Sequence, residues 1–221
     1  QILRMAKAFL FDLNGTIVDD MAYHKKVWYH VLVNELGAKM SFEEVAAEMY
    51  GKNSELLDRV FGKGAFSPEQ VSEIEMAKER KYQEIYRPLM KPIDGLMDFL
   101  VMAHSAGIPM GIGSAAIPFN IDFVLDELNI RHYFSTIVSA FDVPVSKPNP
   151  AVFLKGAQNL GVDPADCIVF EDAPKGVEAA ANAGMKAVAI TTMHTPDEFE
   201  QYNNIIAFTK DYGTLSHLLK N

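Results

Sequence analysis

The stretch that decides the fold is residues 9–16, which read FLFDLNGT. Three apolar residues run directly into Asp12, and a glycine and a threonine follow shortly after it. A buried parallel strand ends in this way when its carboxyl edge carries chemistry, because ligands bind in the crevice outside that edge. Gly15 would let the chain turn sharply beside the acidic residue. The stretch therefore predicts a central strand with Asp12 at its tip.

Alternating strands and helices extend this pattern over most of the chain. Apolar runs that predict buried strands lie at residues 8–11, 109–112, 167–170 and 187–190, with a weaker one at 136–139. Helical patterns between the later runs lie at residues 119–128, 151–160 and 176–183. This alternation indicates an α/β fold, a Rossmann-like doubly wound parallel sheet with helices on both faces.

One block interrupts the alternation. It contains helical patterns only, at residues 21–35, 42–50, 54–61 and 68–86. We expect an all-helical cap domain at residues 18–92, inserted into a core domain formed by residues 1–17 and 93–221. Domains of this kind close over a site and exclude water.

Composition excludes several classes of function. The 221 residues carry a net charge of −9, which argues against a nucleic-acid or anionic-membrane partner, since both need a basic surface. No apolar run approaches the ~20 residues of a membrane span, and no secretory signal is visible. Cys167 is the only cysteine, so no internal disulfide forms. We expect a cytoplasmic globular protein, whose oligomeric state the sequence leaves open.

Three further stretches with polar residues lie at or just after predicted strand ends. Residues 111–115 read GIGSA, which suits the close approach of a phosphate. Residues 146–150 read SKPNP and place Lys147 in a rigid turn, while Glu171 and Asp172 stand side by side. The carboxyl ends of parallel strands meet at one edge, so we expect all these side chains to converge with Asp12.

The acidic residues Asp12, Glu171 and Asp172 have no His or Cys beside them in sequence. Hard oxygen ligands of this kind favour Mg²⁺, which takes its remaining ligands from water and a substrate phosphate. Carboxylates so close together repel one another unless a cation separates them. Lys147 and the Ser114 hydroxyl would hold the phosphoryl oxygens. Phosphoryl transfer chiefly needs such positioning and charge neutralisation.

These four stretches, in this order, resemble the motifs of the haloacid dehalogenase (HAD) superfamily over nearly the whole chain. The runs EDAPKGV at 171–177 and AAANAGM at 179–185 are highly specific. The cap position is similar to that of the branch that contains β-phosphoglucomutase and many small-metabolite phosphatases. Asp19, His24 and Trp28 resemble the start of a β-phosphoglucomutase cap.

The resemblance implies an aspartyl-phosphate mechanism with Asp12 as the nucleophile. It implies that Asp12, the backbone carbonyl of Asn14 and Asp172 ligate Mg²⁺, with Glu171 beside them. The transferring group would be bound by Ser114, Ala115 and Lys147.

The chain departs from the family at Asn14, where HAD phosphatases have a second aspartate. That aspartate protonates the leaving group and later activates water, which a carboxamide cannot do. Losing a general acid–base costs about 10²–10⁴-fold, or roughly 3–5 kcal/mol of barrier. We therefore expect a protein that binds Mg²⁺ and substrate but turns over slowly. It is either a disabled variant of an active enzyme, which we favour because the other catalytic elements are intact, or a natural member with a binding role.

Residues of the cap carry weaker signals. The resemblance implies that His24 pairs with a cap lysine, Lys78, to orient the leaving group. The alternative places Lys78 on the solvated face of a charge-rich helix, which is the default for such a sequence. Trp28 reads as a packing residue.

Two features bear on the substrate. Ala116 and Ile117 stand where β-phosphoglucomutase has polar and basic residues for a second phosphate, which argues against the mutase. Glu48 precedes Gly51 in a turn that faces the active site in this branch, and a carboxylate there would be useful if it contacted a metal or a metal-bound water. The chain is therefore similar to pyrophosphate-hydrolysing members, and pyrophosphate is the favoured small phosphorylated substrate. A phosphomutase, a silent phosphate-ligand binder, and a merely solvated Glu48 remain alternatives.

Overall fold

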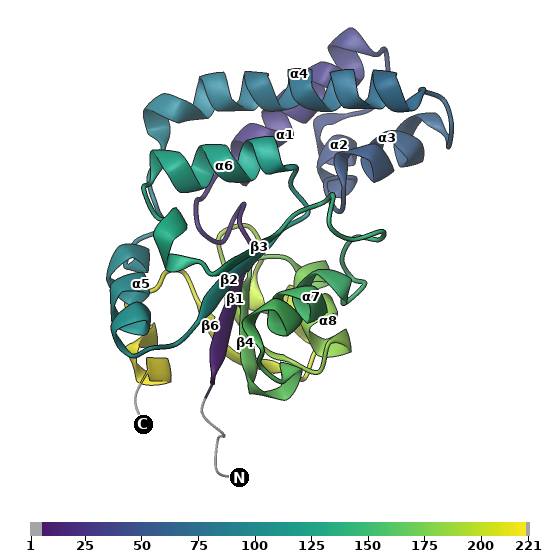
Figure 1. The fold of residues 1–221 in the computed structure, drawn as a ribbon. Coiled ribbons are helices and arrows are strands. Elements are labelled where there is room, and N and C mark those ends of the chain that lie inside the picture. Colours follow the sequence, from purple (N-terminus) through teal and green to yellow (C-terminus); the bar gives the residue numbers. More distant parts are fainter. Residues whose placement is uncertain (1–5, 220–221) are drawn as a thin grey trace. The chain divides into compact units, whose positions relative to one another are not determined.

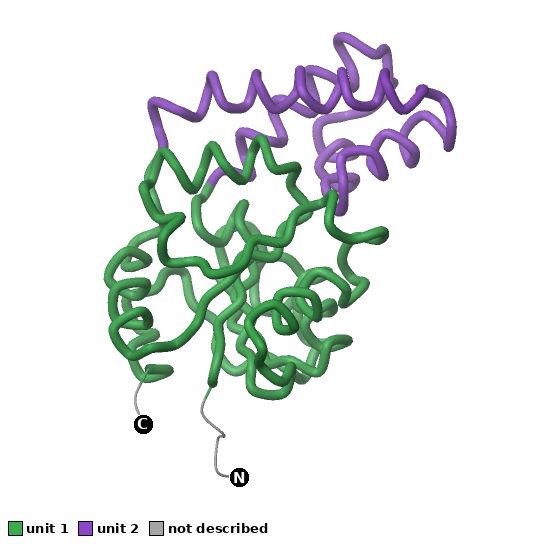
Figure 2. The backbone as a smooth tube through the Cα atoms, viewed as in Figure 1, with its two compact units in different colours: residues 1–19, 91–221 green, residues 20–90 purple. Residues whose placement is uncertain are grey.

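The structure, a computed structural model, describes residues 6–219. The outer ends of the predicted core domain, residues 1–5 and 220–221, lie outside this range. The chain divides into two compact units, unit 1 (Gln1–Asp19 and Lys91–Asn221) and unit 2 (Asp20–Met90), coloured in Figure 2. At both junctions unit 2 begins or ends two residues inside the expected cap segment, 18–92.

Unit 1 contains a six-stranded parallel sheet with the order β3-β2-β1-β4-β5-β6 (Figure 1). The strands are β1 (Ala8–Phe11), β2 (Met110–Gly113), β3 (Thr136–Val138), β4 (Cys167–Glu171), β5 (Lys186–Ile190) and β6 (Ile205–Thr209). The α/β prediction is confirmed, and the five predicted strands are present with small changes at their ends. Because β1 pairs with both β2 and β4, Asp12 leaves the middle of the sheet.

The sixth strand, β6, was not predicted. It lies at the edge of the sheet, and its residues are half-buried or exposed. It pairs with β5 through an irregular register at Ala187 and Val188. An edge strand lacks the full burial on both faces that makes a central strand recognisable in sequence.

Side chains on β1 alternate between the two faces of the sheet. Leu10 belongs to a buried cluster with Phe153 of α7 (Ala151–Leu160), which packs on the same face as α8 (Pro174–Asn182). Phe9 points to the opposite face and stacks on Phe99 of α5 (Leu96–Ser105), with ring centroids 5.5 Å apart. Figure 1 shows α7 and α8 on one side of the sheet and α5 on the other. Among residues 6–219, the remaining α-helix of this unit is α6 (Pro118–Glu127), and the unit also contains short 3-10 helices.

Regular structure in unit 2 is entirely helical. It consists of α1 (Met21–Tyr29), a π-helix (His30–Glu35), α2 (Phe42–Ala47), α3 (Asn53–Phe61) and α4 (Pro68–Tyr86), followed by a short 3-10 turn (Arg87–Leu89). Ser41 and Ser67 begin α2 and α4 with capping boxes, which satisfy the otherwise unbonded first N–H groups. Within residues 6–219, no helix is long and apolar enough to cross a membrane.

Candidate functional site

An acidic cluster forms at the carboxyl edge of the sheet in unit 1. Asp12 follows β1, Glu171 ends β4, and Asp172 comes next in the chain. One carboxylate oxygen from each lies within 4.8 Å of the others. These three side chains are almost completely buried. The convergence expected from the sequence is therefore present for the acidic residues.

Lys147 joins two of these carboxylates. Its Nζ lies 2.6 Å from Asp12 Oδ1 and 2.6 Å from Glu171 Oε1. Burial alone would lower the pKa of Lys147, but the charges of Asp12 and Glu171 outweigh it and raise that pKa. Lys147 is therefore a fixed positive charge inside the cluster.

Glu171 has both carboxylate oxygens engaged. Oε1 accepts from Lys147, and Oε2 accepts from the backbone N–H groups of Asp172 (3.0 Å) and Ala173 (3.1 Å). Gly176 makes room for this carboxylate, because a Cβ there would lie 1.9 Å from its Oε1 and Cδ atoms. The glycine of the EDAPKGV run is thus explained by the packing of Glu171.

Thr16 was not among the expected site residues, although it belongs to the opening stretch. Its hydroxyl lies 3.3 Å from Asp172 Oδ1 and 3.4 Å from Asp12 Oδ2, so it bridges two acids. Gly15 has a φ of +81°, and a Cβ there would lie 2.2 Å from Asp172 Oδ2. Gly15 is therefore required both by the turn and by the close approach of Asp172. Its carbonyl accepts from the Thr192 hydroxyl (2.7 Å), another contact that the sequence does not reveal.

The other expected residues of unit 1 occupy neighbouring strand ends. Ser114 follows β2 and is buried, and its hydroxyl accepts from the backbone N–H of Ala116 at 3.0 Å. Ala115 is half-buried beside it. Asn14 is also half-buried and forms an isolated parallel bridge with Val18. Both Ser114 and Asn14 are placed at the carboxyl side of the central strands, β2 and β1.

The cluster holds three carboxyl groups against one lysine. Burial raises the pKa of Glu171 to about 7, against the attraction of Lys147. Burial, and then the charges of Glu171 and Asp12, hold the pKa of Asp172 well above its usual range. Carboxylates in such surroundings are stabilised by a cation, and an all-oxygen donor set is the kind that Mg²⁺ prefers. The residues present therefore fit this metal.

Unit 2 contains a second buried group of polar side chains. Lys78 Nζ lies 2.8 Å from His24 Nδ1, so the expected pairing of these two residues is present. Lys78 is 2% exposed, which shows that the solvated-face reading is wrong for this residue. Trp28 is buried, as expected for packing, and its ring lies 5.2 Å from Lys78 Nζ.

Asp20, Glu79 and Tyr82 complete this group, and the sequence did not identify them. Asp20 Oδ2 lies 3.2 Å from His24 Nε2 and accepts a hydrogen bond from the Tyr82 hydroxyl. Glu79 Oε1 accepts from Lys78 Nζ at 2.9 Å. A signal was available, because Lys78 and Tyr82 lie four residues apart and so share a helix face.

Glu48 has a partner that the sequence did not reveal. Arg59 Nε donates to Glu48 Oε2 at 2.8 Å, and its Nη2 donates to the carbonyls of Glu48 (2.7 Å) and Tyr50 (2.8 Å). The guanidinium also stacks over the Tyr50 ring at 3.7 Å. The charge of Glu48 is therefore compensated locally.

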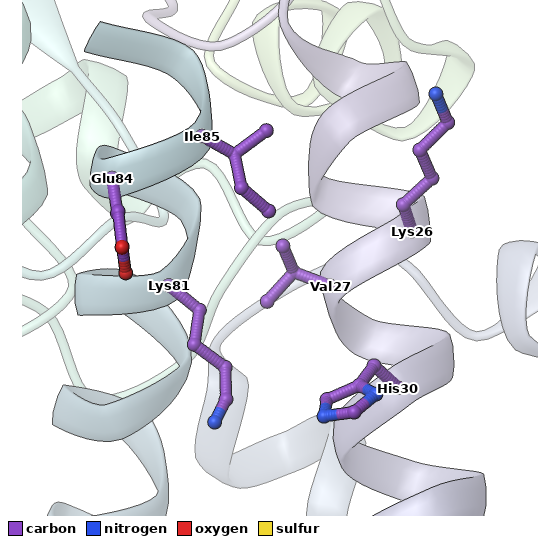
Figure 3. Close-up of a pocket in the computed structure, with 6 residues that line it drawn as sticks. All are labelled: Lys26, Val27, His30, Lys81, Glu84 and Ile85. Carbon is purple, nitrogen blue, oxygen red and sulfur yellow. The ribbon is translucent and has the colours of Figure 1, made fainter.

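A cavity of about 370 Å³ lies elsewhere in unit 2, between α4 and the helix formed by α1 and the π-helix that follows it (Figure 3). Its lining is formed by Lys26, Val27, His30, Lys81, Glu84 and Ile85. None of the expected site residues lines it.

Comparison with known proteins gives consistent matches. Residues 6–184 match the haloacid dehalogenase-like hydrolase family. Fructose-1-phosphate phosphatase YqaB of Escherichia coli is 31% identical over 183 residues, 82% of this chain and 94% of that protein. β-Phosphoglucomutase of Bacillus subtilis is 31% identical over 199 residues, 83% of either chain. The crystal structure of β-phosphoglucomutase from Clostridium difficile is similar with a TM-score of 0.78 at 28% identity, and covers 91% of both chains.

Proposed function

Because the chain belongs to the haloacid dehalogenase-like hydrolase family, in its β-phosphoglucomutase-like branch, we propose that it is a phosphohydrolase for a small phosphorylated metabolite. One observation carries the proposal. A buried lysine, Lys147, contacts Asp12 and Glu171 at 2.6 Å in a cluster that also holds Asp172. Carboxylates with a fixed cation are what an aspartyl-phosphate mechanism requires.

In this proposal an Asp12 oxygen attacks the substrate phosphorus. An acyl-phosphate bond forms while the bond from phosphorus to the leaving oxygen breaks, and the leaving oxygen takes up a proton from solvent, because the Asn14 carboxamide has none to donate. Lys147 lowers the negative charge of Asp12 enough for a phosphate to approach, and Ser114 and the backbone beside Ala115 bind its oxygens. Water then attacks the phosphorus and loses a proton to solvent, and the bond from phosphorus to the Asp12 oxygen breaks, which releases inorganic phosphate and restores the Asp12 carboxylate.

Asp12, Asp172 and the backbone carbonyl of Asn14 are the proposed protein ligands of Mg²⁺. When bound, Mg²⁺ supplies positive charge that stabilises the phosphoryl oxygens. Glu171 remains beside these ligands, but both its oxygens already accept hydrogen bonds, so we assign it to holding Lys147 in place. The Thr16 hydroxyl bridges the two aspartates and fixes their positions relative to each other.

The second part of the proposal concerns which phosphorylated compound is the substrate. Glu48 is the residue through which the sequence favours pyrophosphate, and its pairing with Arg59 at 2.8 Å leaves its charge compensated. That pairing removes the reason to prefer pyrophosphate, and the relative YqaB is named as a fructose-1-phosphate phosphatase. We therefore place a sugar phosphate monoester first and keep pyrophosphate as the second substrate. His24 and Lys78 are proposed to contribute to substrate binding.

Asn14→Asp tests the reaction. The substitution restores a titratable group that can protonate the leaving oxygen and activate water, so phosphate release should rise about 10²–10⁴-fold. Inorganic phosphate is measured with fructose 1-phosphate, β-glucose 1-phosphate and pyrophosphate. Asn129→Asp is the matched control, because Asn129 is exposed beyond the end of α6 and undergoes the same chemical change.

Other outcomes assign other functions. Isomerisation of β-glucose 1-phosphate without phosphate release would replace the hydrolase by a phosphomutase, the activity of the relative from Bacillus subtilis. Binding of a phosphorylated ligand with no chemistry in the Asn14→Asp variant would leave a binding protein. Either result contradicts the proposal.

A further inference from the structure

We propose that Asp20 and Glu79 are positioning residues that hold His24 neutral and Lys78 charged, so that Lys78 offers a spare N–H to an anionic ligand. This inference rests on the proposed function for the ligand's chemistry, a phosphate ester. The arrangement itself lies wholly within unit 2.

The hydrogen bonds of His24 determine its protonation. A carboxylate only accepts, so His24 Nε2, 3.2 Å from Asp20 Oδ2, carries a proton. An ammonium only donates, so Nδ1, 2.8 Å from Lys78 Nζ, accepts and carries none. His24 is therefore the neutral Nε2–H tautomer. Its ring stacks on Tyr82 with centroids 3.8 Å apart, which fixes the ring plane.

Glu79 supplies the countercharge that Lys78 needs. A buried lysine loses its proton readily without an anionic partner, and Lys78 Nζ lies 2.9 Å from Glu79 Oε1. Asn53 Nδ2 donates to the same oxygen at 3.0 Å and fixes its position. Although burial opposes it, the attraction of the Lys78 ammonium lowers the pKa of Glu79. The pair is thus held in its charged form.

Stability alone does not explain why the Lys78–Glu79 ion pair is buried. Both side chains of the Lys78–Glu79 pair are 3% exposed, and a buried ion pair seldom stabilises more than apolar residues of similar size. Glu79 Oε2 is also buried without a hydrogen-bond partner among residues 6–219. Within the same part of the chain, His24 and Glu79 accept hydrogen bonds from Lys78 Nζ, which engages two of its three N–H groups. The third is the donor that we assign to the anionic ligand.

The first test reads the tautomer without any substrate. Nitrogen-15 NMR of the His24 ring, in the protein as it exists, is expected to show a neutral imidazole protonated at Nε2 near pH 7. An imidazolium, or a proton on Nδ1, would overturn the inference even if the protein is a phosphatase. Asp20→Asn should reduce the population of the Nε2–H tautomer, and an unchanged spectrum would contradict the role of Asp20.

The second test uses kinetics in the Asn14→Asp background. Glu79→Gln should lower kcat/KM for fructose 1-phosphate about 10- to 100-fold, the range for loss of an orienting partner. It should also move the alkaline limb of the pH profile to lower pH, because Lys78 loses its countercharge. Glu73→Gln is the matched control, because Glu73 is an exposed glutamate on the same helix and loses the same charge. An unmoved limb in Glu79→Gln, or an equal shift in both variants, would refute the role of Glu79.

Discussion

Gly15 illustrates how much of the candidate site depends on single atoms. Its positive φ allows the turn that follows Asp12, and the missing Cβ leaves the space that Asp172 Oδ2 occupies. The missing Cβ of Gly176 likewise leaves space for the Glu171 carboxylate. Neither glycine carries chemistry, yet each allows an acidic side chain to approach the backbone more closely than any larger residue permits.

Gly15→Ala should therefore destabilise the protein more than a change of conformation alone. A positive φ costs an alanine about 1–2 kcal/mol, and the overlap with Asp172 should add roughly 1–3 kcal/mol. Denaturant unfolding measures the difference. Gly37→Ala is the matched control, because Gly37 has a φ of +78° and nothing within 4 Å of the added Cβ. Equal losses in both variants would show that the contact with Asp172 is unimportant.

At the scale of elements, α4 has one exposed face and one buried face, and both carry charged residues. Its exposed face carries the charged residues expected of a surface helix, while Glu75, Lys78, Glu79 and Tyr82 are buried. Burial raises the pKa of Glu75, partly offset by a hydrogen bond from the backbone of Ser54. The helix therefore buries charge along one face, and a pH dependence of stability follows.

The sign of that dependence follows from the raised pKa of Glu75. A group whose pKa is higher in the folded state contributes stability below its unfolded pKa, near 4.3, and loses that contribution as the pH rises through its folded pKa. Glu75→Gln has no carboxyl group to ionise, so the variant does not lose this stability as the pH rises. The melting temperature of the variant should therefore exceed that of the parent near pH 7.5, and the gap should shrink toward pH 4.

Glu73→Gln controls for the loss of one negative charge. Glu73 lies on the same helix and is exposed, so its substitution should change the melting temperature little at either pH. A gap that is the same for both variants, or that widens toward pH 4, would show that burial of Glu75 does not govern the effect.

At the scale of the whole molecule, two buried lysines contrast with the negative net charge of the chain. The net charge is −9, yet each unit buries a lysine among carboxylates, Lys147 in unit 1 and Lys78 in unit 2. An anionic substrate is disfavoured by the overall charge, so local cations must compensate at the site. The acidic cluster of unit 1 carries more carboxylates than its lysine can balance.

Mg²⁺ should consequently stabilise the protein, whether or not it turns over substrate. At 100 times its dissociation constant, a bound ion contributes about 2.7 kcal/mol, or roughly 5–10 °C in melting temperature. Asp172→Asn should abolish most of this shift. Without Mg²⁺ the same variant should melt no lower than the parent, because the charged form of Asp172 is disfavoured in the fold.

The control for this experiment is Asp58→Asn, which removes an exposed carboxylate from unit 2. Its Mg²⁺-dependent shift should match that of the parent. If Asp172→Asn keeps the full shift, or if both variants lose it equally, the ion does not bind at the strand tips.

The sequence by itself determined the five strands β1 to β5 and the acidic residues at two of their ends. Central strands are buried on both faces, so their apolar runs end abruptly at Asp12 and Glu171, and the pattern is visible without the fold. The helical insertion was equally clear, because its pattern has a different period. The edge strand β6 was missed because partial exposure weakens that pattern.

Only the tertiary structure decided which charges meet. The sequence led us to expect that Lys147 meets Asp12, from their shared sheet edge, and that His24 meets Lys78, from the family resemblance. These pairs are nevertheless 135 and 54 positions apart in the chain, so the fold alone sets their contacts. The pairing of Glu48 with Arg59, the burial of Glu79 and the bridging hydroxyl of Thr16 likewise depend on how helices and strand tips pack. Local sequence records the type of a side chain and its periodicity. Charge partners depend on distance, which folding alone sets.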